Sequence, residues 1–277
     1  WQGLFVDVTL TIRDVFCILF YWIPTLRHHM SIYLYGFTLS SAPHDFEDLS
    51  GVDDRGLFLV TCGDVSAIVS SYDYDTLHIR GKDIFAHQQV IRGLMDQASI
   101  IPLEFGLTLK NLPAVEDVLL KNQEHLRIEL HRVFNKVEME VALRFASNDL
   151  FEYMVGKYPF LGEEKAKVVN GRLLYSLGDR ARKCEKFEHE LKKEKDAYAS
   201  KVDELIGPWC AEIARSRLIH RDHAVATFNC LVNRERLKVF EKSIYDAAEL
   251  WGGDLLFSLN GPWAPQHFCN VSKIAYA

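Results

Sequence analysis

The apolar positions in the first half of the chain fall into short runs that predict strands and three- and four-residue repeats that predict helices. A strand is expected in "SIYLYGF", residues 31–37, where β-branched and aromatic residues precede a loop rich in Asp, Ser and Pro. Two further apolar runs flank Gly63 and Asp64. Because both residues tolerate the positive φ of a tight turn, the two runs are expected to form a β-hairpin.

Two helices and a connecting strand complete this part of the pattern. Residues 83–97, "DIFAHQQVIRGLMDQ", place Phe85 and other apolar residues largely on one helical face, with Asp83 available as the cap. Residues 113–137 have a helical repeat throughout. With the strand-like "SIIPLEFGLTLKN" between them, these elements predict an N-terminal α+β domain over residues 30–135.

A second unit begins at "KVEMEVALRF", where apolar residues alternate with Glu138 and Glu140 on a face expected to be solvated. A helical repeat from about residue 163 to 206 is long enough to project or to form an α-hairpin, and a Gly-Pro pair ends it. Helix, strand, helix and strand are then expected in "WCAEIARSRL", "HAVATFNCLVN", "RERLKVFEKSIYDAAELW" and "GDLLFSLNG". This order predicts a modified ferredoxin-like C-terminal domain over residues 136–277, with a long helical insertion and helices on one face of its sheet. The predicted fold class is therefore α+β with two domains.

Residues 1–29 differ from the rest of the chain. They lack an initiating Met, and their uninterrupted apolar run, 15–23, is shorter than the about 20 residues that span a bilayer. Acidic residues precede this run and no small-residue cleavage site follows it, so a signal peptide is a poor fit. Because Met30 and a strand follow at once, we interpret residues 1–29 as an upstream, non-native extension. The alternative is an additional amphipathic helix or strand on the first domain.

Composition narrows the class of partner. The chain has 277 residues, 48% hydrophobic and 25% charged, which is enough for a sizeable globular core. A net charge of −6 gives no positive field for phosphate backbones or anionic lipids, so neither nucleic acid nor a membrane is expected as a partner. The six cysteines form no CxxC pair and no zinc-type set, so a cytoplasmic protein without metal site or disulfide framework is expected. Cys62 and Cys230 stand in apolar runs and are expected in the core.

Candidate catalytic groups are few, since the sequence has no GxSxG, P-loop, GxGxxG or HExxH motif. His87 in "FAHQQV" is a candidate general base, but its helical position is more typical of a structural histidine with a hydrogen bond. Glu138 and Glu140 resemble an acid/base pair, yet their alternating neighbours favour a solvated strand face. His131 has no partner at metal-ligand spacing, and the acidic loop at 45–54 lacks the regular ligand positions of a calcium loop. No catalytic residue, cofactor or metal is expected.

Two stretches rich in proline and glycine have unusual local chemistry. In "IIPLEFG", Pro102 cannot donate to a ladder and Gly106 relaxes the backbone, which predicts an edge strand or a bend. Phe105 is expected to close the core of the first domain.

The second such stretch is the ending "SLNGPWAPQHF". Gly261 permits a sharp turn, Pro262 and Pro265 stiffen the path, and Trp263 and Phe268 can bury large areas. We expect this tail to strap back across its own domain and bury Trp263 between the two domains. The alternative is a pre-organised arm that binds a partner.

Four stretches together resemble a known family. They are "IFAHQQVIRGLMDQASIIPLEFG", "LRIELHRVFNKVEMEVALRF", "HAVATFNCLVNRERLKVF" and "DLLFSLNGPWAPQHF". Their order and rough spacing are similar to those of the gas vesicle accessory proteins of the GvpF/GvpL family, and with "YLYGF" the resemblance covers nearly everything from Met30 to Phe268. Ala264, Gln266 and His267 depart from the commoner family ending GPWPPYSF. Glu104 stands where PLRFG or PMSFG is commoner.

The resemblance implies a non-enzymatic, minor structural or chaperone-like component of gas vesicle assembly, which works on the vesicle with the small hydrophobic shell protein and other accessory proteins. The family motifs mark as candidate structural or partner-binding positions His87, Pro102, Phe105, Gly106, Glu138, Gly261, Pro262, Trp263, Pro265 and Phe268. Two alternatives stay open: a ferredoxin-like small-molecule enzyme with an interdomain site, and a coiled-coil adaptor built on the long charged helix. A polar pocket with convergent titratable groups would favour the enzyme, and an exposed apolar groove would favour assembly.

Overall fold

The computed structural model describes residues 31–43, 45–73, 80–162, 167–169, 172–174, 177–216 and 223–276. The interpretation of residues 1–29 as an upstream extension falls outside these ranges. Within them, none of the helices combines the length and the hydropathy that a membrane span needs.

The first part of the chain forms an antiparallel sheet with strand order β2-β3-β1-β4, in which β5 also pairs with β1. Its strands are β1 (Ser31–Leu39), β2 (Leu57–Cys62), β3 (Val65–Tyr72), β4 (Ile100–Pro102) and β5 (Thr108–Leu109). The predicted hairpin is confirmed, because β2 and β3 pair across a turn in which Gly63 has a φ of 58°.

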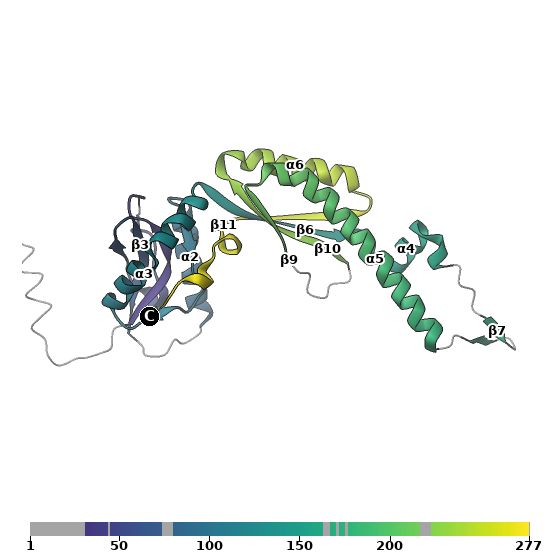
Figure 1. The fold of residues 1–277 in the computed structure, drawn as a ribbon, viewed down its shortest axis with the longest axis horizontal. Coiled ribbons are helices and arrows are strands. Elements are labelled where there is room, and N and C mark those ends of the chain that lie inside the picture. Colours follow the sequence, from purple (N-terminus) through teal and green to yellow (C-terminus); the bar gives the residue numbers. More distant parts are fainter. Residues whose placement is uncertain are drawn as a thin grey trace, which may run out of the picture.

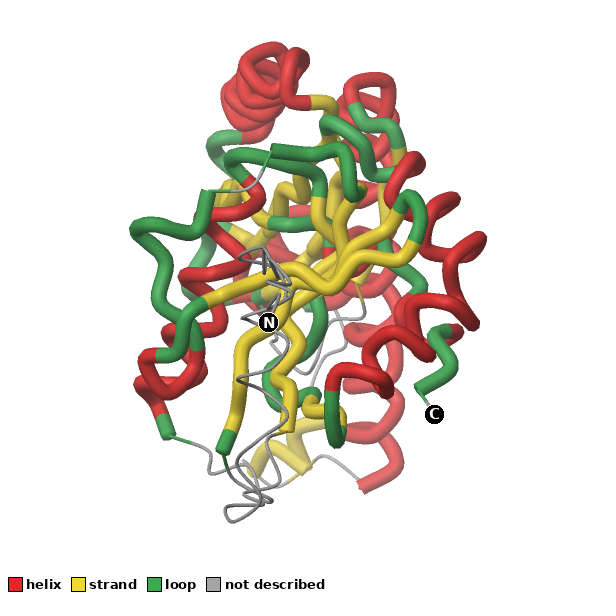
Figure 2. Tube along the Cα trace, turned by 90° about the vertical axis from the view of Figure 1, so that its left-hand side faces the viewer, coloured by secondary structure: helices red, strands yellow, loops and turns green. Residues whose placement is uncertain are grey.

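Two helices, α2 (Gly81–Met95) and α3 (Leu112–Arg132), cover opposite faces of this sheet. Successive side chains of a strand point to opposite faces. Accordingly, Leu34 of β1 lies in the buried cluster with α3, and Tyr35 lies in the cluster with α2. In Figure 2 the helices lie outside the strands on both sides. The first unit is therefore a three-layer arrangement with two cores.

Two predictions about α2 are wrong. Asp83 is not the N-cap, because Arg80 holds that position, and the buried carboxylate instead accepts a hydrogen bond from Arg80 Nε at 2.6 Å. Phe85 is not on the buried face, because that face turns His87 and Val90 inward and leaves Phe85 62% exposed.

The second sheet is antiparallel with strand order β11-β6-β10-β9. Its strands are β6 (Lys136–Phe145), β9 (Glu212–Ser216), β10 (Ala224–Asn233) and β11 (Leu255–Trp263). Helices α5 (Leu177–Ile206) and α6 (Leu237–Trp251) cover one face, where Val202 and Phe240 join Val141 and Phe228 in one buried cluster. This is the predicted ferredoxin-like arrangement, and Figure 1 shows α5 projecting beyond its sheet.

Two local predictions in this unit are wrong, and one helix was missed. "WCAEIARSRL" contains β9 instead of a helix, because pairing with β10 overrides a weak local pattern. The helix does not start near residue 163, because a hairpin of β7 (Lys167–Val169) and β8 (Arg172–Leu174) precedes α5. The short helix α4 (Leu150–Lys157), capped by Asp149, was not expected.

Beyond β11 the chain turns back onto the first unit. Ala264 joins the core between the first sheet and α2, whereas Cys269 and Ile274 join the core beneath α3. Figure 1 shows the C terminus beside α3. The tail covers its own sheet only at the end near Glu138, and its buried side chains pack against the first unit, so the predicted strap across its own domain is wrong for most of its length. The change of sheet between α3 and β6 coincides with the domain boundary that we propose at residue 135.

Candidate functional site

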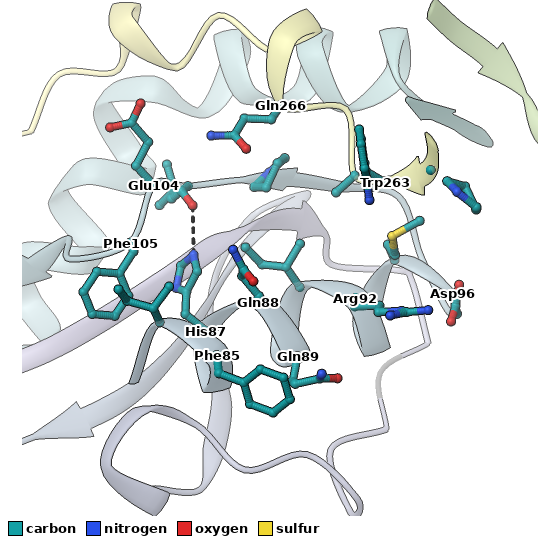
Figure 3. Close-up of a pocket in the computed structure, with 18 residues that line it drawn as sticks. Phe85, His87, Gln88, Gln89, Arg92, Asp96, Glu104, Phe105, Trp263 and Gln266 are labelled. Atoms are coloured by element: carbon teal, nitrogen blue, oxygen red, sulfur yellow. Dashed lines mark hydrogen bonds between the residues drawn. The ribbon is translucent and has the colours of Figure 1, made fainter. Parts of the chain in front are cut away.

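A groove of about 890 Å³ lies between α2 and the segment that ends β11 (Figure 3). Helix α2 forms one wall, the stretch after β4 forms the floor, and the start of the tail forms the other wall. The lining residues are Ile84, Phe85, His87, Gln88, Gln89, Ile91, Arg92, Met95, Asp96, Pro102, Leu103, Glu104, Phe105, Gly261, Pro262, Trp263, Ala264 and Gln266. The structure therefore brings together six of the positions singled out in the sequence, namely His87, Pro102, Phe105, Gly261, Pro262 and Trp263.

Two exposed aromatic rings and three uncharged amides stand on the two walls, beside aliphatic residues and the charged Arg92, Asp96 and Glu104. Phe85 on α2 is 62% exposed, and Trp263 on the tail is 45% exposed. The amides of Gln88 and Gln89 lie on the helix wall, and Gln266 lies on the tail wall. The expectation that Trp263 is buried between two domains is wrong, because the tail presents its ring at the groove surface.

His87 lies beneath the groove and is 3% exposed. Its Nε2 donates to the carbonyl oxygen of Leu103 at 3.0 Å, so Nδ1 accepts from the hydroxyl of Tyr33 at 3.0 Å. The hydroxyl oxygen of Tyr33 in turn accepts from the backbone N–H of Gly106 at 2.9 Å. Burial lowers the pKa of His87, which keeps the ring neutral, and burial raises the pKa of Tyr33.

This hydrogen-bond chain makes His87 a structural residue. Both ring nitrogens are engaged by protein groups, so neither is available to take a proton from a bound molecule. The ring of Tyr35 stacks on the imidazole with 5.5 Å between the ring centroids. The ring of Phe105 contacts the imidazole edge-on, with 5.8 Å between the centroids. The chain ties α2, β1 and the floor of the groove together.

The floor is the stretch that the sequence marked as a bend or edge strand. Pro102 ends β4, and Gly106 has a φ of 107°, a conformation that glycine adopts readily. Phe105 packs against the core under α2 and stays partly exposed at its edge. It contacts the cluster under α2 and also lines the groove.

The prediction of a solvated Glu138 is wrong. Its side chain is 1% exposed, because the tail lies over this end of the second sheet. The carboxylate accepts a hydrogen bond from the backbone N–H of His267 at 2.9 Å and also contacts the Nδ1 atom of the same residue. Glu138 therefore holds the segment that follows the groove wall.

Further contacts fix the tail to α3. Arg132 forms an ion pair with Glu212 of β9 at 2.8 Å and donates to the carbonyl oxygen of Phe268, which is buried. Asn122 bonds both the N–H and the carbonyl oxygen of Ala275, each at 3.0 Å. Pro265 is also buried. Positions 138, 265 and 268 thus anchor the tail without lining the groove.

The remaining charged candidates lie apart from the groove. Glu140 accepts a hydrogen bond from Asn260 at 3.0 Å on the second sheet, and His131 is exposed. In the acidic loop, Asp53 pairs with Arg80 at 2.8 Å, and the hydrogen bond from Arg80 lowers the pKa of this carboxyl. In the part of the chain that the structure describes, no group of His, Cys, Asp or Glu is placed to hold a metal ion.

The cysteine predictions have different outcomes. Cys230 is buried as expected, and its high pKa follows from the neighbouring Cys210 thiol and from burial. Cys62 is only partly buried, because it lies on the edge strand β2.

Sequence reasoning missed the polar wall of the groove and the anchors of the tail. Gln88 and Gln89 stand next to His87 in the motif "FAHQQV", and their place in this motif could have indicated that they belong to the site. Arg132 and Glu212 meet from distant parts of the chain, and no local pattern predicts such a pair.

Fold and site define a class: an α+β protein with a ferredoxin-like second sheet, whose groove is walled by exposed aromatic rings and amides. Residues 31–270 match the family described as "Gas vesicle synthesis protein GvpL/GvpF". The chain belongs to this family.

Individual relatives agree with this assignment. The chain is 26% identical to "Gas vesicle protein F" of Streptomyces sp. (strain CB03234) in an alignment of 247 residues that covers 86% of this chain and 99% of that protein. It is 21% identical to "Gas vesicle protein F" of Haloferax mediterranei over 210 residues, 75% of this chain and 78% of that protein.

Solved structures share the fold. The crystal structure of the gas vesicle protein GvpF from Anabaena sp. PCC7120 superposes with a TM-score of 0.77 at 18% identity, over 87% of this chain and 98% of that one. The structure of GvpF from Microcystis aeruginosa gives a TM-score of 0.72 at 16% identity, over 87% and 99%.

Proposed function

We propose that this protein is a non-enzymatic assembly protein of gas vesicle formation, a minor structural or chaperone-like component that binds the hydrophobic shell protein. The observation that carries the proposal is the groove, with Phe85 and Trp263 exposed on its two walls. Family membership supports the gas vesicle part of the proposal. The protein would act in the cytoplasm and on the vesicle, together with other accessory proteins.

The groove has the chemistry of a protein-binding surface. Exposed aromatic rings are costly in water, and large aromatic side chains dominate the binding energy of protein interfaces. Gln88 and Gln266 face the same space, and each amide can both donate to and accept from a backbone. These features suit an apolar polypeptide segment with unpaired backbone groups.

The enzyme alternative has less support from the same groove. Among its titratable residues His87 has both nitrogens occupied within the protein, which removes the candidate general base. Arg92 and Asp96 lie toward one end of the groove, and Glu104 lies toward the other (Figure 3). This separation does not produce the convergent acid and base that small-molecule chemistry requires.

Co-purification with the shell protein tests the proposal. We expect the tagged wild-type protein to retain shell protein from co-expressing cells, and the double variant Phe85→Ala/Trp263→Ala to retain about tenfold less, since two aromatic anchors are lost. Tyr245→Ala is the matched control, because Tyr245 is an exposed aromatic residue of α6 away from the groove. Equal retention by the double variant and the control would contradict the proposed function of the groove. Absence of retention by the wild-type protein would contradict shell-protein binding itself.

A further inference from the structure

The second sheet ends on one side at β11, which pairs with β6 and, among the described residues, with no other strand. The opposite edge is β9. A free edge presents unpaired N–H and C=O groups, and proteins usually protect such edges with charges, short strands or bulges. The two edges of this sheet differ in that protection.

Strand β9 is protected in two ways. It has only five residues, and two of them are charged. Glu212 forms an ion pair with Arg132 at 2.8 Å, and Arg215 forms one with Asp196 at 3.2 Å. These pairs place charged side chains of α3 and α5 beside the edge, which opposes the addition of another strand.

Strand β11 lacks this protection over most of its length. Its nine residues, "LLFSLNGPW", include no charged side chain. The register shift between Asn260 and Trp263 disturbs the ladder only at the end that reaches the groove. The segment from Leu255 to Asn260 is therefore a regular and uncharged free edge.

The hydrogen-bond register shows which backbone groups point away from β6. Ala146 N–H donates to the carbonyl oxygen of Asp254 at 2.8 Å, so this opposed pair is a bonded one. Bonded and non-bonded pairs alternate along an antiparallel ladder. When this alternation is continued along the register, the backbone groups of Leu256 and Ser258 bond to β6. The N–H and C=O groups of Phe257 and Leu259 then point away from β6, toward the free edge.

The side chains along this edge are also incompletely covered. Phe257 and Leu259 are partly buried on the face that α6 covers, and Leu256 is 39% exposed on the opposite face. A strand added beside β11 would pair the outward backbone groups and cover apolar surface on both faces.

We propose that the free edge of β11 accepts an extended, uncharged segment of the shell protein as an additional strand of the second sheet. The proposal rests on the proposed function. Two observations select this occupant: the edge offers no charge to pair with a charged partner, and it is continuous with the groove, which Gly261 to Trp263 also line. A segment bound in the groove can therefore run on along β11, and β-strand addition supplies affinity through main-chain bonds.

Amide hydrogen exchange, resolved to single residues in the co-purified complex with the shell protein, tests the proposal. We expect exchange at the Phe257 and Leu259 amides to slow at least tenfold relative to the free protein, because these N–H groups become paired. The amides of Leu256 and Ser258 are internal controls, since β6 already pairs them. A complex in which the Phe257 and Leu259 amides exchange as in the free protein would overturn the proposal and leave the proposed function standing. If no complex forms, both fail together. Protection that appears at high concentration without shell protein, together with a doubled mass, would identify a second copy as the occupant and also overturn the proposal.

A pair of variants separates main-chain pairing from packing. Leu259→Ala removes the side chain and keeps the outward N–H, whereas Leu259→Pro removes the same packing and the N–H as well. We expect Leu259→Ala to retain shell protein and Leu259→Pro to lose it. Equal retention by the two variants, with equal circular dichroism, would contradict pairing at this edge.

Discussion

At the scale of residues, His87 links the groove to the core of the first unit. It is 3% exposed, bonds Tyr33 and Leu103, and is held neutral because burial lowers its pKa. The same hydrogen-bond chain reaches Gly106, so two separate sequence motifs meet through Tyr33. The unfolded chain takes up a proton at His87 as the pH falls through about 6.5, and the folded protein resists it, so unfolding is favoured below that pH.

The variant His87→Gln tests this coupling. We expect wild-type stability to fall between pH 7 and pH 5, with His87 contributing up to about 1.4 kcal/mol per pH unit. The variant should be less stable at pH 7, because it loses the imidazole bonds, and its stability should depend less on pH. Urea unfolding at the two pH values measures both effects. Parallel pH dependence in the two proteins would show that His87 does not titrate as described.

Gly261 sets the direction of the groove wall. Its φ is 121°, and a Cβ there would lie 2.9 Å from the carbonyl oxygen of Glu138 and 2.8 Å from the sulfur of Met139. We expect Gly261→Ala to destabilise the protein by about 2 kcal/mol or more and to weaken shell-protein retention. Gly253→Ala is the matched control, because a Cβ at Gly253 meets nothing within 4 Å. Denaturant melts that place both variants within about 0.5 kcal/mol of each other would contradict this role.

At the scale of elements, the structure shows why some segments were predictable. The sequence of β6 places Val137, Met139, Val141, Leu143 and Phe145 at every second position, and α3 begins at a capping asparagine, so local chemistry agrees with the element that forms. The local pattern of β9 favours a helix, whereas the structure has a strand there. Its five residues are held by pairing with β10, and pairing between distant segments cannot be recognised in a short local pattern.

The candidate site was only partly predictable for a related reason. Motif positions such as His87 and Trp263 were found, and the structure places them at one groove. The sequence did not predict the burial of Glu138. Alternation along β6 distinguishes the two faces of the strand, but it does not show that the tail covers one of them at Glu138. The apolar repeat of α2 predicts a buried Phe85, yet its side chain points to solvent in the structure.

The tail is an element whose anchoring can be tested directly. Deleting residues 269–277 removes Cys269 and Ile274 from the core beneath α3 and the Ala275 partner of Asn122. We expect the midpoint of thermal unfolding to fall by roughly 5 °C or more, since buried apolar contacts worth about 2 kcal/mol are lost. Lys273→Ala, an exposed change in the same segment, should leave the midpoint unchanged. An unaltered melt after the deletion would contradict the strap.

At the scale of the whole molecule, two sheets with separate cores are joined by β6 and by the returning tail. Arg132 contacts α3, β9 and the tail together, through Glu129, Glu212 and the carbonyl oxygen of Phe268. The groove therefore has one wall from each unit, and its shape depends on their attachment. We propose that the shell protein binds on this surface.

Hydroxyl-radical footprinting of the co-purified complex tests this binding surface, because it reports the accessibility of single side chains. We expect Phe85 and Trp263, which are 62% and 45% exposed in the free protein, to lose reactivity when the shell protein is bound. Tyr245, which is 69% exposed on α6, should react as before. A complex in which Phe85 and Trp263 remain as reactive as in the free protein would contradict the assignment of the groove as the binding site.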